Sequence, residues 1–233
     1  MRGSVSLGFV VVGCVLVAGC GSSGGAARPT TSAPTPTTTT AAIAPVAEGG
    51  LRALLLYPEE IGPIMGATDM KAHAPHDVLP DDSTTMQPRE CLAVDGVAQE
   101  QVYARSGFTA VREQTVSDGE DNAHFVDQAV VLFPTAKQAE AFFEVSAKQW
   151  PECREYTHTQ SGSQWTAGRI SNADGVLSTV ATQQNAGDSA WQACGRALTV
   201  ANNVVVDVNT CSTDPKDSAV VIARQIAAKV PKG

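Results

Sequence analysis

Two β-rich runs that meet at Asn202-Asn203 constrain the fold more than any other feature of the sequence. Asparagine tolerates the positive φ that two-residue hairpin turns need, so the pattern predicts a β-hairpin over residues 192–210. With Ala201 facing Val204 across the turn, the same register places Cys194 directly opposite Cys211. Counted from the turn they form a non-hydrogen-bonded pair, in which side chains approach most closely. We therefore expect a Cys194–Cys211 disulfide.

The N-terminus is typical of a bacterial lipoprotein signal peptide. A positive start at Arg2 precedes an apolar run over residues 5–18, which is shorter than the roughly 20 apolar residues that span a bilayer. The run ends in Val17-Ala18-Gly19-Cys20, which resembles a lipobox, in which the cysteine thiol accepts a diacylglycerol. We predict a signal peptide over residues 1–19 and lipidation of Cys20, rather than an ordinary signal peptide with an incidental cysteine.

Low-complexity sequence follows the lipidated cysteine. Residues 20–50 are rich in Gly, Ser, Thr and Pro and have little apolar surface to bury, which predicts a disordered tether about 30 Å across. Residues 51–233 suit one domain with its own core. The chain has a net charge of −8 and no basic cluster, which argues against nucleic acid as a partner. We expect the lipid alone to hold the domain on the extracytoplasmic face of the cell membrane.

Four cysteines remain after the tether, and an even number in an exported chain argues for disulfides. With Cys194 assigned to Cys211, elimination pairs Cys91 with Cys153. The alternative is a zinc site, but thiolate ligands of zinc usually come as two close pairs, and these four cysteines contain no C-x-x-C. We expect no metal and no cofactor.

The remaining sequence predicts helices and hairpins in alternation. Two further hairpins are expected, over residues 108–116 with 124–133 and over 165–170 with 176–183. Apolar spacing and capping residues predict helices over residues 53–65 (broken), 95–104, 135–150 and 217–230, with a long loop over 68–90. Together these elements predict an α+β fold: an antiparallel β-sheet with helices packed on one face and two disulfides.

One face of the third hairpin carries polar side chains that suggest a binding surface. Strand alternation places Arg196 and Asp207 on it as diagonal neighbours, and Asn209 follows two positions later. Antiparallel sheets often leave one face to solvent, so we expect this face to be open. Two interpretations follow: a surface ion pair, which contributes little to stability, or the floor of a ligand groove containing Arg196, Asp207 and Asn209. On the second, Arg196→Ala weakens ligand capture without unfolding the domain.

A set of apolar, aromatic and cysteine residues is spread through the domain: Val131-Leu132-Phe133-Pro134-Thr135-Ala136, Ala139, Phe142-Phe143, Trp150, Cys153, Trp191, Cys194-Gly195-Arg196-Ala197-Leu198, Asn202-Asn203-Val204-Val205, Cys211, Ile222-Ala223, Ile226-Ala227 and Val230-Pro231. Over about residues 51–232 this set resembles the extracellular sensor domain of the mycobacterial PknH-type Ser/Thr kinases, which also occurs in actinobacterial lipoproteins. The resemblance implies a helix-backed antiparallel sheet, two disulfides and a large polar cleft for an unidentified ligand. The family's catalysis lies in the kinase half, so the resemblance implies no catalytic residue here.

Catalytic signatures are missing from the sequence. It contains no G-x-S-x-G, no H-E-x-x-H and no phosphate-binding loop. We therefore expect that the protein is not an enzyme. Three function classes remain, ranked as a ligand-binding module for a small envelope molecule, a protein-interaction lipoprotein that docks on a membrane or signalling partner, and a hydrolase without a local signature. A cleft with convergent polar groups favours the first, an exposed apolar patch the second, and carboxylates or histidines with shifted pKa values the third.

Overall fold

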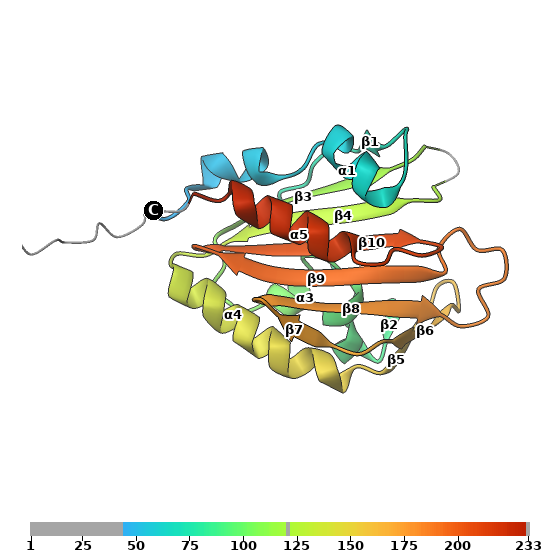
Figure 1. The fold of residues 1–233 in the computed structure, drawn as a ribbon. Coiled ribbons are helices and arrows are strands. Elements are labelled where there is room, and N and C mark those ends of the chain that lie inside the picture. Colours follow the sequence, from blue (N-terminus) through green and yellow to red (C-terminus); the bar gives the residue numbers. More distant parts are fainter. Residues whose placement is uncertain (1–43, 120–121, 232–233) are drawn as a thin grey trace, which may run out of the picture. The chain divides into compact units, whose positions relative to one another are not determined.

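Ten strands form one antiparallel sheet that organises the domain (Figure 1). The structure, a computed structural model, describes residues 44–119 and 122–231. The strands run in the order β1-β3-β4-β10-β9-β8-β6-β5-β2, and β7 pairs with β8 beside this path. Their bounds are β1 Lys71–Ala72, β2 Met86–Gln87, β3 Ala110–Ser117, β4 Phe125–Leu132, β5 Glu155–His158, β6 Gln164–Ala167, β7 Ser171–Ala173, β8 Val176–Gln183, β9 Ala193–Ala201 and β10 Val204–Ser212. The α+β class is thereby confirmed.

The central hairpin has the register that its turn predicts. Asn202 takes a φ of 52°, Val204 pairs with Ala201, and Cys211 lies opposite Cys194. Both expected disulfides are present: the Cα atoms are 4.1 Å apart in Cys194–Cys211 and 5.0 Å apart in Cys91–Cys153. The two-residue turn thus fixes the pairing of residues far along both strands.

The other two hairpins form with one local change. β3 and β4 pair as expected, from Ala110 with Leu132 to Ser117 with Phe125. The second hairpin is split into β6 and β7, both of which pair with β8, because the register shifts by one residue around Gly168. The sequence analysis missed β5, a short strand whose residues Glu155–His158 are too polar to stand out.

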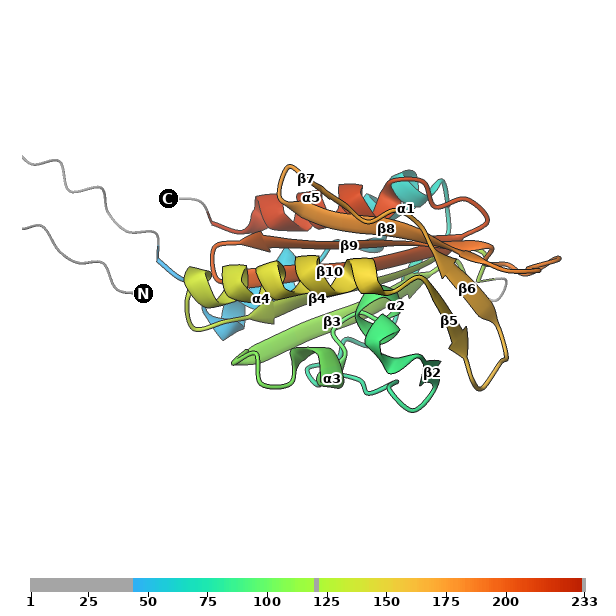
Figure 2. The same cartoon turned by 90° about the horizontal axis from the view of Figure 1, so that it is seen from below.

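Helices cover both faces of the sheet, so the expectation that they pack on one face is wrong. The helices are α1 Pro58–Met65, α2 Leu92–Asp95, α3 Glu100–Tyr103, α4 Ala136–Gln149 and α5 Ser218–Lys229. Seen from below, α5 and α4 lie on opposite sides of β9 and β10 (Figure 2). Alternate residues of β10 feed two separate cores: Val204, Val206 and Val208 pack with α5, whereas Val205 packs toward α4. Both faces of these strands carry apolar side chains, and each face is buried beneath helices.

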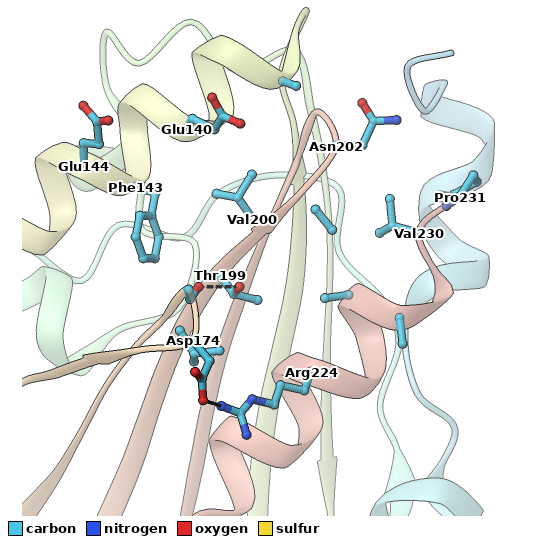
Figure 3. A pocket seen from close by; sticks show the side chains of 16 residues that line it. Glu140, Phe143, Glu144, Asp174, Thr199, Val200, Asn202, Arg224, Val230 and Pro231 are labelled. Carbon is cyan, nitrogen blue, oxygen red and sulfur yellow. Dashed lines mark hydrogen bonds and ion pairs between the residues drawn. The ribbon is translucent and has the colours of Figure 1, made fainter. Parts of the chain in front are cut away.

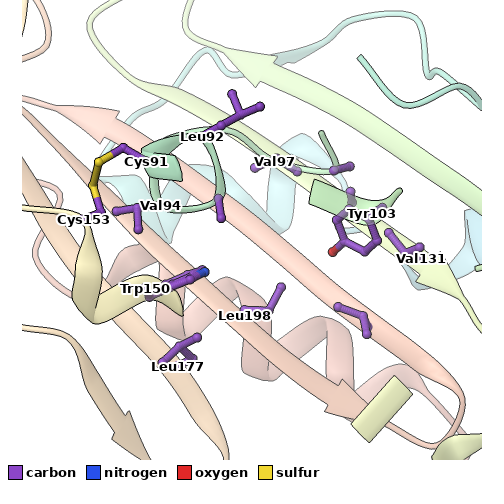
Figure 4. Packing of buried hydrophobic residues seen from close by; sticks show 14 of the residues in the cluster. Cys91, Leu92, Val94, Val97, Tyr103, Val131, Trp150, Cys153, Leu177 and Leu198 are labelled. Atoms are coloured by element: carbon purple, nitrogen blue, oxygen red, sulfur yellow. A yellow bond between two sulfur atoms is a disulfide. The ribbon is translucent and has the colours of Figure 1, made fainter. Parts of the chain in front are cut away.

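The core beneath α4 is built from aromatic residues and one disulfide. Thr135 caps α4 by accepting a hydrogen bond from the Gln138 backbone N–H, as its position predicts. Trp150, which follows α4, is 1 % exposed and packs near Leu198 and the Cys91–Cys153 disulfide (Figure 4). This core therefore ties α4 and the Cys91 segment to the sheet.

Of the predicted helix over residues 95–104 only α3, Glu100–Tyr103, forms, and a separate short helix, α2, ends at Asp95. Ala98 lies between them with a φ of 48°, a conformation that interrupts a right-handed helix. We call residues 91–103 the cover, because this segment lies over the sheet on the same side as α4 (Figure 2). Its apolar side chains are buried: Leu92, Ala93, Val94, Val97 and Tyr103.

The ordered domain begins before residue 51. Val46 N–H donates to Asn203 Oδ1 at 2.7 Å, and Glu48–Leu54 form a 3-10 helix that precedes α1, so this stretch belongs to the fold rather than to the tether. The predicted signal peptide, the predicted lipidation site Cys20 and the predicted tether up to residue 43 lie outside the described residues. Within the described ranges no helix is long and apolar enough to span a bilayer.

Candidate functional site

Two neighbouring rows of residues cross the sheet beneath the cover. Strand pairing aligns Asp127 of β4 with Asn209 of β10 and Arg196 of β9 in one row. In the next row Glu113 of β3 lies opposite Ala129, which lies opposite Asp207 of β10. Two-residue periodicity turns both rows toward the cover, so four strands concentrate charged side chains at one place.

Arg196 and Asp207 form a buried ion pair rather than an exposed one. Their side chains are 3 % and 2 % exposed, and Arg196 Nη1 donates to Asp207 Oδ1. The expectation that this face is open to solvent is wrong, because the cover lies on it. Arg196 Nη2 donates to Gly96 O at 2.6 Å, and the Ala98 backbone N–H donates to Asp207 Oδ2 at 3.0 Å. The pair therefore fastens the cover to the sheet.

Aromatic residues enclose the same ion pair. Tyr103 Oη donates to Asp207 Oδ2 at 2.9 Å, and the Arg196 guanidinium lies 5.3 Å from the centre of the Trp150 ring. Burial, followed by the charge of Asp207, raises the pKa of Tyr103 well above 10, so its hydroxyl remains a donor. Asp207 thus has a partner on every side, which a charge so deeply buried requires.

Glu113 and Asp127 form a second buried acidic group beside the ion pair. Burial, followed by the charges of Asp127 and Asp207, raises the pKa of Glu113 to about 9. Burial and the charge of Asp207 also raise the pKa of Asp127, to about 7, although Arg196 acts in the opposite direction. Glu113 Oε2 and Asp127 Oδ1 are buried and have no hydrogen-bond partner among the described residues. At neutral pH Glu113 therefore holds a proton.

A polar cavity of about 160 Å³ opens at the end of these rows. Asn209 lines it and donates through Nδ2 to Asp95 O of the cover at 2.8 Å. His158 Nε2 lies 3.1 Å from Asp95 Oδ1, and this hydrogen bond raises the His158 pKa against the opposing effect of burial. The full lining is Asp82, Asp95, Gly96, Val97, Gln99, Phe125, Asp127, His158, Trp165, Trp191, Cys194, Asn209 and Cys211. We call this the polar cavity.

Aromatic side chains form the walls of the polar cavity. Phe125 and Trp191 have ring centres 5.0 Å apart, and those of His158 and Trp165 are 6.1 Å apart. The floor includes the Cys194–Cys211 disulfide, and the roof is the cover from Asp95 to Gln99. Three carboxylates, two indoles and a phenyl ring thus converge on a space about as large as an engineered cavity that holds benzene.

A second hollow, of about 880 Å³, lies between α4, the turn after β7, and α5 (Figure 3). Phe143, Val200 and Val230 supply apolar lining, and Arg224 Nη2 donates to Asp174 Oδ2 at 3.3 Å near its edge. Asn202 at the hairpin turn also lines it and donates to Ala44 O at 2.9 Å. We call this hollow the groove. It has both the volume and the largely apolar lining of an ordinary ligand pocket.

The two hollows differ in the chemistry that they offer. The polar cavity has three carboxylates and a histidine around a small space, whereas the larger groove combines an apolar lining with charged residues such as Glu140, Glu144 and Arg224. Glu113, the protonated acid, does not line the polar cavity, so it cannot pass its proton directly to a bound molecule. Among the described residues no group of three His, Cys, Asp or Glu has the geometry of a metal site. The arrangement is suited to binding.

The structure brings the three residues expected to bind a ligand together but gives them different roles. Asn209 lines the polar cavity, whereas Arg196 and Asp207 lie beside it under the cover. Sequence analysis missed the residues that complete the cavity: Asp82, Asp95, Asp127, His158, Trp165 and Trp191. One signal was available, because Asp127 is the one charged residue of β4, a largely apolar strand. Its alignment with Asn209 depends on the β4–β10 pairing, which no local pattern indicates.

Comparisons with known proteins agree with this architecture. Residues 46–229 match the family model described as the PknH-like extracellular domain. Over 193 residues the chain is 37 % identical to the serine/threonine-protein kinases PknH of Mycobacterium bovis and Mycobacterium tuberculosis. These matches cover 81 % of this chain but 32 % and 30 % of the two kinases. The crystal structure of the extracellular domain of PknH from Mycobacterium tuberculosis matches with a TM-score of 0.74 and 36 % identity, over 80 % of this chain and 97 % of that one.

Proposed function

Because this chain belongs to the PknH-like extracellular domain family, we propose that it is a lipid-anchored, sensor-like module that binds a ligand outside the cytoplasmic membrane. The chain spans about a third of the length of the kinases that it matches, and the match is to their extracellular part. On this proposal it carries out no catalysis, needs no cofactor and binds no nucleic acid. A lipid on Cys20 holds the domain at the membrane, where the tether lets it reach envelope molecules.

The polar cavity is the observation that carries this proposal. Ligand sites combine an apolar or aromatic wall with a few polar groups that fix orientation, and the polar cavity has both. Its volume of about 160 Å³ suits a small molecule or the head group of a larger one. The Cys91–Cys153 disulfide and the Arg196–Asp207 pair fasten the cover, which forms the roof, to the rest of the fold. Such preorganisation favours binding because little order is lost on association.

Mass spectrometry of protein purified from its native envelope tests both parts of the proposal. Under denaturing conditions we expect the intact mass to show loss of residues 1–19 and addition of a diacylglyceryl group to Cys20. Under native conditions we expect a retained small-molecule adduct. An intact mass without the lipid would contradict the membrane anchor. A native mass without an adduct, from a sample in which most of the protein is folded, would count against a bound ligand.

Matched variants locate the adduct. Trp191→Leu alters a wall of the polar cavity, and Phe143→Leu makes a similar reduction in the groove. We expect the adduct to disappear in the Trp191 variant and to persist in the Phe143 variant. If the adduct instead persists in the Trp191 variant and disappears in the Phe143 variant, the ligand binds in the groove.

The alternative function is that of a protein-interaction lipoprotein that docks on a membrane or signalling partner. The groove favours it, because apolar area rimmed by charges is typical of protein contact sites. The exposed large apolar residues of the described chain, Tyr57, Val78, Val145 and Val180, are dispersed over separate elements and add no contiguous patch. This alternative predicts that Phe143→Leu abolishes cross-linking to the protein partner. It makes no prediction about the small-molecule adduct.

A further inference from the structure

We propose that the polar cavity selects a small organic cation, an ammonium head group, with Asp127 as its counter-ion and aromatic walls around it. This inference rests on the proposed ligand-binding function and adds the chemical class of the ligand. It starts from the composition of the lining: Asp82, Asp95 and Asp127 are acidic, whereas His158 is the one basic side chain among the lining residues.

The charges around the cavity are unbalanced once the existing contacts are assigned. Arg196 is committed to Asp207 and to the carbonyl oxygens of Gly96 and Val208, and His158 is paired with Asp95. Asp82 accepts from the uncharged amide of Gln99 at 2.9 Å. Two carboxylates of the lining, Asp82 and Asp127, therefore lack a cationic partner among the described residues.

Asp127 is the side chain best placed to meet a cation. Asp127 lines the cavity, and its Oδ1 atom is buried and has no hydrogen-bond partner among the described residues. An anion held in low-dielectric surroundings beside Asp207 and Asp82 is unfavourable, and a positive charge nearby relieves this repulsion. A cation bound in the cavity therefore gains a favourable electrostatic interaction that a neutral molecule or an anion does not gain.

Aromatic walls supply a second, independent preference for a cation. Phe125 and Trp191 lie together on one side, and Trp165 lies with His158 on another. The faces of indole and phenyl rings attract ammonium groups within about 6 Å, most strongly when water is excluded. A volume of about 160 Å³ admits a quaternary ammonium head group but few larger cations.

Titration calorimetry of the full chain in detergent, with choline as the probe, tests this inference. Its uncharged carbon isostere, dimethylbutanol, has the same shape without the charge, and acetate supplies the opposite charge. We expect choline to bind and both controls to bind at least roughly tenfold more weakly, which corresponds to about 1.4 kcal/mol. Equal binding of the isostere or of acetate in the cavity would overturn the cation preference and leave the ligand-binding function standing.

Variants assign the binding to the cavity. Asp127→Asn keeps the side-chain shape and removes the charge, and we expect it to weaken choline binding at least roughly tenfold. Asp69→Asn removes an exposed carboxylate elsewhere and should change binding less than about twofold. If Asp127→Asn does not fold, Trp191→Leu replaces it and should also weaken binding. Unchanged affinity in either cavity variant excludes this site.

The pH dependence has a defined sign. The groups that face Asp127 are Glu113, Asp207, Arg196 and Asp82, and the paired Asp95 and His158 line the same cavity. With a pKa of about 7, the carboxylate form of Asp127 increases above that pH. Choline should therefore bind more tightly at about pH 8 than at about pH 6, and Asp127→Asn should flatten the profile. Failure of choline to bind at either pH overturns the inference, whereas the native adduct mass still decides the ligand-binding function separately.

Discussion

At the scale of single residues, burial determines what the charged side chains of this domain do. Arg196 and Asp207 make the same ion pair that an exposed strand would make, yet their 3 % and 2 % exposure changes its consequences. A surface pair contributes about 0–1 kcal/mol, whereas removing one partner of a buried pair leaves an uncompensated charge. The residue that seemed best suited to a ligand is therefore required for the structure around the ligand site.

Arg196→Ala should consequently destabilise the domain by about 3–5 kcal/mol, because Asp207 loses its cation and four backbone carbonyls lose a donor. This replaces the expectation that the variant leaves folding intact. Chemical denaturation measures the loss. Arg224→Ala is the matched control, since Arg224 and Asp174 are 52 % and 87 % exposed and their pair should contribute less than about 1 kcal/mol. Equal effects of the two variants would contradict the buried role of Arg196.

Sequence alone could place Arg196, Asp207 and Asn209 on one strand face, since that follows from alternation in a hairpin with a known turn. It could not show their exposure. The cover that buries them comes from a segment about a hundred residues away in the chain, as the Arg196–Gly96 separation of 100 residues shows. Long-range burial of this kind leaves no local signal.

At the scale of elements, predictability follows how local the cause of each element is. The β9–β10 hairpin and α4 depend on a turn and a cap that are visible in sequence, and both form as expected. The cover does not, because the positive φ of Ala98 divides an apparently helical stretch. The surrounding contacts, including the Asp207 bond to the Ala98 backbone N–H, hold that conformation in place.

The two disulfides should differ in their contribution to stability. Cys91–Cys153 joins residues 62 apart and Cys194–Cys211 joins residues 17 apart. In the chain-entropy account the first contributes about 4 kcal/mol, roughly 1 kcal/mol more than the second. We expect the Cys91→Ser, Cys153→Ser double variant to lose more unfolding free energy than the Cys194→Ser, Cys211→Ser variant.

Hydrogen exchange separates local from global effects of these variants. Loss of Cys91–Cys153 should speed exchange in the cover more than in β9 and β10, because the disulfide anchors the start of the cover beside Trp150 (Figure 4). Uniform acceleration across the sheet would show that the disulfide supports the whole domain rather than this segment.

At the scale of the whole molecule, the candidate site arises where distant parts of the fold meet. The polar cavity combines residues from the Asp82 loop, the cover, β4, β5, β6, β9, β10 and the segment around Trp191. The α+β class and both disulfides could be predicted, since they depend on composition, spacing and one turn. The presence of helices on both faces could not be predicted, because the polar residues of β9 and β10 have the alternation that is typical of a solvent-exposed face.

This organisation separates stability from binding. One core lies between the sheet and α5, the other between the sheet, α4 and the cover, and the polar cavity lies at the edge of the second. The molecule can therefore hold a charged, aromatic-lined space without giving up apolar packing elsewhere. The acidic lining costs less free energy than its number of carboxyl groups suggests, because Arg196 and the protonated Glu113 limit repulsion among the carboxylates.

Binding of a cell-envelope molecule in the polar cavity can be followed through the three tryptophans of the chain. Trp165 and Trp191 line the cavity, whereas Trp150 is buried elsewhere beside Arg196. The measurement is nitrogen-15 NMR of the indole groups of the full chain during titration with a small-molecule extract of the native envelope. We predict that the Trp165 and Trp191 signals move together and saturate while Trp150 stays in place. Stationary Trp165 and Trp191 signals throughout the titration would contradict the account.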